Sequence, residues 1–184
     1  IGGVINIITQ SETDGAKIDA GLGSNHYQLY DGRVRPTIAD KTTITAAGSF
    51  EDTRGFNVSP DSPYGPDRDR DGFRSKSFWA GVDHKFSSQF SAFVRGYGYS
   101  NNAEYDANST YPNSANERQL YSRNYDMGLR FLEGNYSSQL VASYQTYKDY
   151  NFNSENGRYN DGTSLDDMTQ RNIQWGNSYK LGSA

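Results

Sequence analysis

The 184-residue sequence contains no cysteine and no long hydrophobic run. The lack of cysteine fits an exported protein that is stable without disulfides. No stretch approaches the roughly 18–20 apolar residues that a membrane-spanning helix needs. A strand of a membrane barrel needs only about 9–11 residues of alternating character, so strands could still cross a membrane.

An excess of positive charge is also missing. The formal net charge is −4, with 18 Lys and Arg against 22 Asp and Glu. Proteins that bind nucleic acid usually carry a basic patch or stripe. Nucleic acid is therefore not an expected partner.

Apolar residues are scarce, but aromatic residues are not. Only 34% of the residues are hydrophobic, whereas globular domains have roughly 45–50%. Aromatic residues make up 14%, with 15 Tyr and 9 Phe. Disordered chains are polar too, but they are poor in aromatics. The composition is typical of a sheet with one wet face and one apolar face, joined by polar loops.

Residues of alternating polarity recur along the chain with period two, as in strands. In 119–131 one face carries apolar residues, and only Arg123 interrupts it; these residues are Tyr121, Tyr125, Met127, Leu129 and Phe131. Similar alternation occurs in 42–50, 138–145 and 172–181. In 90–99 the register is ambiguous, because Arg95 shares a face with Phe93 and Tyr97.

The connections between these segments alternate between short and long. Short turns are expected near 39–41, 87–89 and 133–135, and long polar loops near 54–72, 101–117 and 150–166. Barrels of bacterial outer membranes have short periplasmic turns and long extracellular loops. The sequence thus predicts an all-β, antiparallel transmembrane β-barrel segment rather than a soluble β-sandwich. Its roughly eight strands are expected at 16–24, 27–37, 41–53, 73–86, 90–101, 118–132, 136–149 and 167–181.

The segment 67–72 is acidic and matches the opening of an EF-hand calcium loop, D-x-D-x-D-G. The match fails at Phe78, where an EF-hand has a bidentate Glu. Asp67, Asp69 and Asp71 remain a candidate calcium site completed from other loops, since Ca²⁺ takes about 6–8 oxygen ligands. The further candidates are Asn57, Asp61, Asp106, Asn116 and the backbone oxygen of Tyr105. The alternative is a solvated loop in which Arg68 and Arg70 balance the carboxylates.

Features typical of enzymes are few. The two histidines, His26 and His84, fall in different predicted strands, and no metal-ligand spacing is present. A hydrolase would need one of them beside a serine on the outer face. No serine is singled out, so we predict that the chain is not an enzyme.

The N-terminal run IGGVINIIT is similar to the closing strand of the plug domain in TonB-dependent outer-membrane receptors. Within this family, the branch that takes up cobalamin resembles nearly the whole chain in one register. The resembling segments are GSNHYQLYD (23–31), DRDGFRSKS (69–77), FVRGYGYSNNAEYDA (93–107), QLYSRNYDMGLR (119–130), SQLVASYQTYKDYNF (138–152), GRYNDGTSLDDM (157–168) and IQWGN (173–177).

The resemblance implies a 22-stranded barrel that is closed by an N-terminal plug and driven by the TonB complex of the inner membrane. Residues 1–13 would be the end of the plug, and 14–184 the first part of the barrel in the lipid of the bacterial outer membrane. The substrate would be cobalamin, bound at the extracellular mouth by loops that calcium orders. The resemblance does not indicate which residues contact the substrate.

The resemblance also implies which residues hold calcium. Asp69, Asp71, Tyr105 and Asp106 match positions of the family's calcium cluster, and two further acidic positions correspond to Asn57 and Asn116. Asn can ligate through its amide oxygen, but the lost charge weakens binding. Asp61 or Asp67 could replace that charge.

Two other functions remain open. The chain could form a small, complete outer-membrane barrel with a structural or adhesive role, since eight strands can close alone. It could also belong to a TonB-dependent receptor for another corrinoid or for a siderophore.

Overall fold

Every regular element in the described part of the chain is a strand. The structure, a computed structural model, describes residues 14–57, 61–62, 65–66, 70–105, 116–152 and 164–182. No helix in these residues is long and apolar enough to cross a membrane. The predicted end of a plug domain at 1–13 lies outside them. The strands are β1 (Gly15–Leu22), β2 (Gln28–Arg35), β3 (Thr37–Ile38), β4 (Thr42–Phe56), β5 (Asp61–Ser62), β6 (Gly65–Pro66), β7 (Asp71–Lys85), β8 (Phe90–Tyr105), β9 (Asn116–Glu133), β10 (Tyr136–Phe152) and β11 (Ser164–Tyr179).

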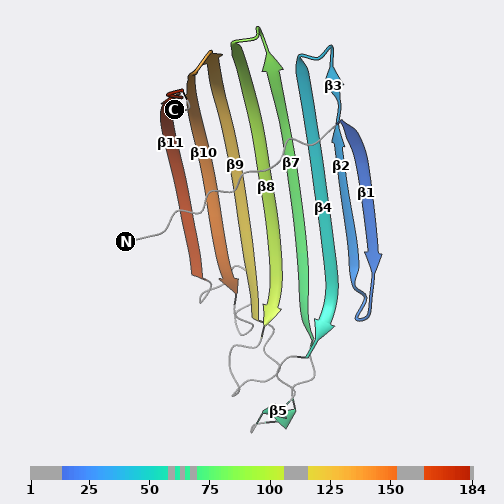
Figure 1. Cartoon of the computed structure of the whole chain (residues 1–184). Coiled ribbons are helices and arrows are strands. Elements are labelled where there is room, and N and C mark those ends of the chain that lie inside the picture. Colours follow the sequence, from blue (N-terminus) through green and yellow to red (C-terminus); the bar gives the residue numbers. More distant parts are fainter. Residues whose placement is uncertain are drawn as a thin grey trace.

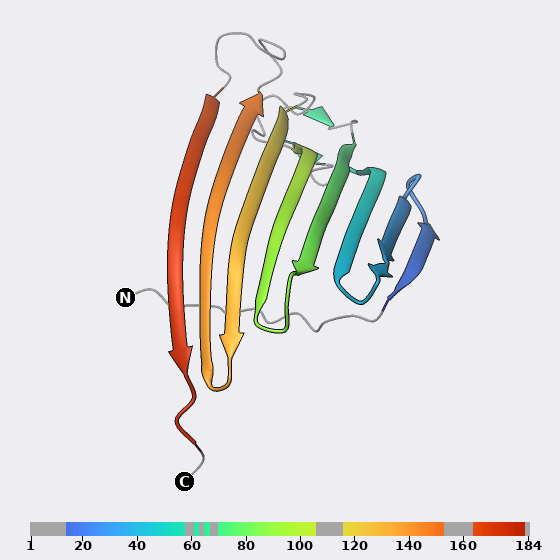
Figure 2. The ribbon, with the colours of Figure 1, turned by 90° about the horizontal axis from the view of Figure 1, so that it is seen from above.

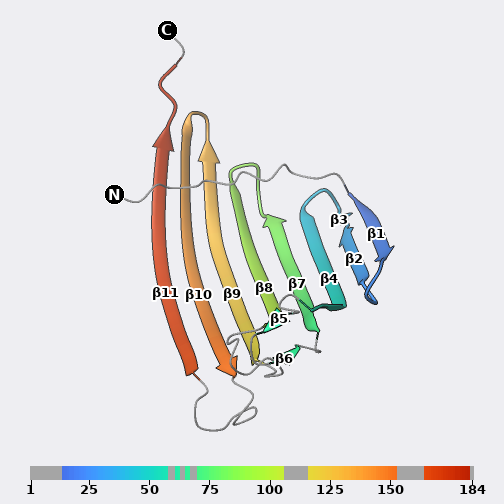
Figure 3. The ribbon, with the colours of Figure 1, turned by 90° about the horizontal axis from the view of Figure 1, so that it is seen from below.

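Nine of the described strands form one antiparallel sheet, with the order β1-β2-β4-β7-β8-β9-β10-β11 and β3 paired to β4. Apart from β3, and from β5 and β6, which pair with each other and come between β4 and β7 in the chain, strands that follow one another along the chain lie next to one another in the sheet (Figure 1). The sheet is a single curved layer, and β1 and β11 lie at its two edges (Figures 2 and 3). The predicted all-β, antiparallel fold is confirmed, and its open sheet is consistent with a segment of a barrel.

The short turns lie together at one end of the sheet, which we call the turn end. They connect β3 to β4, β7 to β8 and β9 to β10. In the first turn, Ala39 and Asp40 both have positive φ, 51° and 54°, and Lys41 N donates a hydrogen bond to Ile38 O, the pattern of a type I′ turn. β4, β8 and β10 end at the opposite end of the sheet, which we call the loop end, and ten or more residues follow each of them before the next strand of this sheet begins (Figure 1). The predicted alternation of short and long connections is confirmed.

All eight predicted strands are present, but some of their limits differ. The strand expected at 27–37 is divided into β2 and β3 at Pro36, which has no N–H to donate to a neighbouring strand. At the loop end, β4, β8 and β10 continue three or four residues beyond the predicted limits, to Phe56, Tyr105 and Phe152. The extensions contain four charged or amide residues, Arg54, Asn102, Glu104 and Asn151, next to polar stretches of the sequence, which made them look like loop.

The two faces of the sheet differ in polarity, and the more apolar face is the more exposed one. In β9, the odd-numbered residues 121–129 are exposed, while the even-numbered residues 122–130 are buried or half-buried. Pairing carries this division across the sheet: Met127 is opposite Val94, which is opposite Val82. Val94 is 60% exposed and Met127 is 59% exposed. We call this side the apolar face and the other the polar face.

The pairing resolves the ambiguous register of β8. Phe93, Arg95 and Tyr97 lie on the polar face, while Val94 and two glycines lie on the apolar face. Phe93 is 5% exposed, because its ring lies between two guanidinium groups. The Cζ atoms of Arg95 and Arg130 are 4.3 and 4.4 Å from the ring centroid.

One carboxylate joins the two arginines on either side of Phe93. Asp83 Oδ1 accepts hydrogen bonds from Arg95 Nη2 at 2.9 Å and from Arg130 Nη1 at 3.1 Å. Each cation–π contact is worth about 0.5–2 kcal/mol, depending on burial. This cluster connects β7, β8 and β9, so it is a small core on the polar face.

Gly128 leaves room for that core, which gives a test of the packing. A Cβ atom at Gly128 would lie 2.4 Å from Phe93 Cζ and 2.9 Å from the backbone oxygen of Leu140. The two arginines hold the ring in place, so we expect Gly128→Ala to destabilise the protein by about 1–3 kcal/mol. Thermal unfolding of the intact protein measures the change.

Gly98→Ala is the matched control in the neighbouring strand. Its Cβ atom would meet nothing closer than Ser122 O at 3.6 Å. Replacing Gly by Ala within a strand, where the side chain fits, is neutral or stabilising. Equal effects of the two substitutions would contradict the packing described for Phe93.

Candidate functional site

Three of the predicted calcium ligands lie at the loop end of neighbouring strands. Tyr105 and Asn116 are the last cross-strand pair of β8 and β9. In β7 and β8, Phe73 is opposite Ala103. Two residues closer to the loop end, the same register puts Asp71 opposite Tyr105. All three then share the polar face, because paired residues lie on one side of a sheet.

A β-bulge fixes the position of Asp71. The register of β4 and β7 shifts between Thr53 and Phe56, so that Phe56 is opposite Asp71. Gly55 has φ +64°, and a Cβ atom there would lie 1.8 Å from Asp71 O, so only glycine fits. Asn57 directly follows this pair. Asn57 therefore lies one residue beyond the Phe56–Asp71 pair, toward the loop end.

The other predicted ligands cannot be placed. Asp67, Asp69 and Asp106 lie outside the described residues, and only the backbone of Asp61 is described, in β5. Within the described part of the chain, no three His, Cys, Asp or Glu side chains come together as a metal site would require.

The donor set at the loop end matches the chemistry of calcium in part. Asp71 offers a carboxylate, Asn57 and Asn116 offer amide oxygens, and Tyr105 offers its backbone carbonyl. These are hard oxygen ligands of the kind that Ca²⁺ prefers, but Ca²⁺ takes about 6–8 of them. The remaining ligands would have to come from the adjoining loops, where three of the predicted carboxylates are.

Side-chain contacts join β8, β9 and β10 close to the Tyr105–Asn116 pair. Tyr105 Oη donates a hydrogen bond to Asn151 Oδ1, which links β8 to β10 across β9. The guanidinium of Arg118 contacts both oxygens of Asp149, and the Nε–Oδ1 distance is 2.9 Å. The two long loops that follow β8 and β10 therefore begin from strands that are tied together.

The same ion pair changes the acidity of Asp149. Hydrogen bonds and attraction from Arg118 hold the pKa of Asp149 below its usual value, although partial burial opposes this. The carboxylate in turn raises the pKa of Arg118. Both groups stay charged at neutral pH, so the pair serves to fix the strand ends and not to transfer protons.

The two histidines lie at opposite ends of the sheet. His26, in the β1–β2 connection at the loop end, is 3.4 Å from Arg54 Nη1 through its Nε2. His84, near the turn end of β7, is 2.8 Å from Thr42 Oγ1 through its Nδ1. Neither contact is the Ser–His pair that the hydrolase hypothesis requires.

Sequence reasoning missed a basic groove on the polar face. The groove has a volume of about 1010 Å³ and lies toward the turn end. One acidic residue, Asp83, lines it beside six cationic residues: Arg33, Arg35, Lys41, Lys85, Arg95 and Arg130. The spacing of Arg33 and Arg35, two residues apart, was a usable signal, because it puts both on one face of a strand. The groove can hold an anionic group or an acidic segment.

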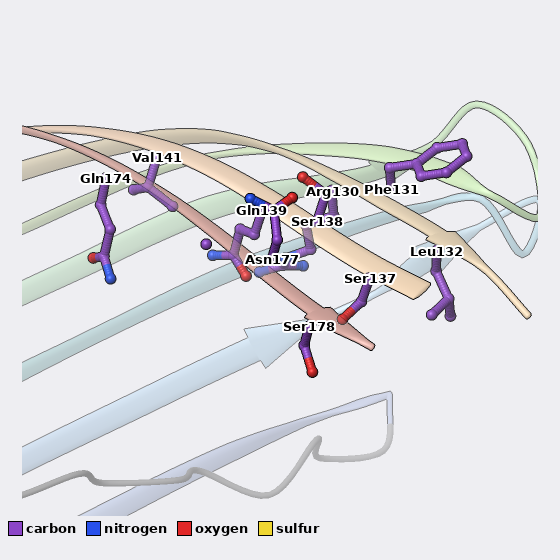
Figure 4. Close-up of a pocket in the computed structure, with 11 residues that line it drawn as sticks. Arg130, Phe131, Leu132, Ser137, Ser138, Gln139, Val141, Gln174, Asn177 and Ser178 are labelled. Carbon is purple, nitrogen blue, oxygen red and sulfur yellow. The ribbon is translucent and has the colours of Figure 1, made fainter. Parts of the chain in front are cut away.

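A second hollow, of about 510 Å³, lies at the turn end between β9, β10 and the edge strand β11 (Figure 4). Its lining is mostly Ser, Gln and Asn, and Arg130 is its one titratable residue. It therefore offers no general acid or base for catalysis at neutral pH.

No family model matches this sequence. The geometry and the chemistry of the residues therefore carry the functional argument.

The Arg118–Asp149 pair predicts how stability depends on pH. A lowered pKa means that the pair stabilises the fold above the pKa of the unfolded Asp, about 3.9, and that this contribution is lost as the pH falls through the lower folded value. We expect Asp149→Asn to lower the melting temperature at about pH 7 and to change it little at about pH 2. Thermal unfolding of the intact protein at both pH values measures this.

Arg118→Gln is the matched variant, since it removes the partner. The double variant should lose no more stability than either single one if the two residues act as a pair. A loss in Asp149→Asn that is as large at acidic pH as at neutral pH would contradict the assignment.

Proposed function

We propose that this chain is part of the wall of a bacterial outer-membrane barrel, a TonB-dependent receptor that takes up cobalamin. The observation that carries the membrane part is the exposure of the apolar face, where Val82, Val94 and Met127 are all more than 40% exposed. In a water-soluble sheet the apolar side would be the covered one. Lipid provides the environment that these side chains need.

The connections support the same orientation. Short turns gather at one end and long loops at the other, which is the arrangement of periplasmic turns and extracellular loops. The loop end would then be the extracellular mouth. The basic groove on the polar face would line the interior, where the plug of such a receptor lies.

The open sheet favours a large barrel over a small closed one. Closing these strands alone would require β1 to pair with β11, but β1 has 8 residues and β11 has 16. Half of β11 would then keep unpaired backbone groups. Further strands beside β11 would satisfy them, as a larger barrel provides.

Calcium and the substrate enter the proposal through the loop end. Asp71, Asn57, Asn116 and the carbonyl of Tyr105 would hold calcium together with Asp69 and Asp106, and Asp61 or Asp67 could add charge. The ion would draw neighbouring loops together before the substrate arrives. Ordering a loop in advance raises affinity, because less entropy is lost on binding. The choice of cobalamin rests on the resemblance in sequence alone.

The proposal predicts that calcium and cobalamin bind cooperatively. Cobalamin binding to the intact protein is measured by equilibrium titration with calcium and with a chelator. We expect calcium to increase the affinity by about 5–150-fold, the usual range of coupling between two sites. Asp69→Ala/Asp71→Ala should abolish that increase.

Glu133→Ala is the control, because it removes an exposed acid at the turn end, away from the loops. It should leave the increase unchanged. Tight cobalamin binding that ignores calcium would remove calcium from the proposal and leave the receptor. Absence of cobalamin binding under every condition would show that the substrate is wrong.

A further inference from the structure

Four cations lie on the apolar face close to the loop end. Arg123 is the residue that interrupts the alternation of β9, and it lies on this face above Tyr125 and Met127. The pairing places three further cations on the same face at or above its level. We call the four the cationic rim: Arg74, Lys76, Arg123 and Lys148.

The turn end of the apolar face has no such rim in the strands that the structure describes. There the face carries Phe90, Leu129, Leu140 and Trp175. The cations of that end line the groove on the polar face instead. Two acids on the same face pair with rim cations, Asp52 with Arg74 at 2.6 Å and Asp167 with Lys148 at 3.0 Å. Charged side chains of both signs therefore border the apolar surface at the loop end.

Arg123 and Lys148 line one notch in the rim. Arg123 is opposite Thr146, and Lys148 is opposite Tyr121, so the two cations are diagonal neighbours on adjacent strands, within reach of one another. The notch has a volume of about 280 Å³ and is lined by Tyr121, Ser122, Arg123, Thr146, Lys148 and Tyr150.

The notch combines positive charge with hydroxyl groups and aromatic rings. Lys148 is bound to Asp167 at 3.0 Å, while Arg123 is exposed and has no ion pair among the described residues. The rings of Tyr121 and Tyr150 are in edge contact, with centroids 6.2 Å apart. Arg binds phosphate through two parallel hydrogen bonds, and Tyr is enriched where a membrane meets water.

We propose that this notch binds the phosphate of an anionic lipid head group. The inference rests on the proposed function in one respect, the contact of the apolar face with lipid. Arg123 would donate to the phosphate and Lys148 would add charge. The acyl chains would lie along Tyr125 and Met127 on the same face, which favours a lipid over a free anion.

Native mass spectrometry of the intact protein in neutral detergent tests the site, with phosphatidylglycerol as the probe and phosphatidylcholine as the neutral lipid. We expect phosphatidylglycerol to bind preferentially. Arg123→Gln/Lys148→Gln should weaken its binding by about tenfold or more, the effect of losing a hydrogen bond to a charged group. Lys17→Gln/Lys180→Gln removes the same charge from positions outside both the notch and the basic groove and should keep the binding.

Several outcomes would overturn the proposal. One is equal binding of the two lipids, and another is an equal loss in both double variants. Competition by millimolar inorganic phosphate would show that the notch selects the free anion and not the lipid.

A second measurement separates this proposal from the proposed function. Trp175, on the apolar face, is 70% exposed. Its fluorescence, taken as the difference between the parent and Trp175→Phe, should be quenched by brominated phosphatidylcholine if that face meets lipid. Quenching without preference for phosphatidylglycerol overturns the notch alone. Absence of quenching overturns the membrane part of the proposed function as well.

Discussion

The alternation of side chains across a continuously paired sheet is the constraint on which the rest of this structure depends. Because antiparallel pairing keeps partners on the same side, one choice of side for Met127 settles the side of Val94 and Val82 as well. The polar side chains are drawn together on the other side, where Asp83 joins Arg95 and Arg130. Both the apolar surface and the basic groove follow from this single register.

The cluster around Phe93 shows how polar groups can build a core. The ring is 5% exposed, and two guanidinium groups lie over it. An isolated buried charge would be costly, but Asp83 neutralises part of the charge of both arginines. A few such contacts hold three long strands together on a face that is otherwise wet.

Much of the fold could be predicted from the sequence, because period-two alternation in β9 and β10 is almost unbroken. Where it failed, the cause was physical. Arg95 was ambiguous because its role depends on Arg130, which is far away in the chain and close only after β8 and β9 pair. The strand ends at Tyr105 and Asn151 were mistaken for loop because the bond that joins them links residues of different strands.

The candidate site was predicted less completely. The acidic segment at 67–72 was evident as a local motif, but its relation to Tyr105 and Asn116 required either the resemblance or the strand register. The basic groove gathers residues from β2, β4, β7, β8 and β9 and the turns beside them. No local motif could indicate it, since its members come together only when the whole sheet forms.

The unequal lengths of the strands give the loop end an uneven height. The last pair of β1 and β2 contains Gln28. From strand to strand, Gln28 is opposite Asp52, Asp52 is opposite Arg74, Arg74 is opposite Asn102 and Asn102 is opposite Gln119. The last pair of β1 and β2 is therefore level with Gln119 of β9. The last pair of β8 and β9 is at Asn116, three residues further (119 − 116 = 3). At roughly 3.3 Å per residue, the ladder between β8 and β9 runs about 10 Å further toward the loop end than the ladder between β1 and β2. β8 and β9 therefore hold the start of the connection between them further from the middle of the sheet than β1 and β2 hold theirs.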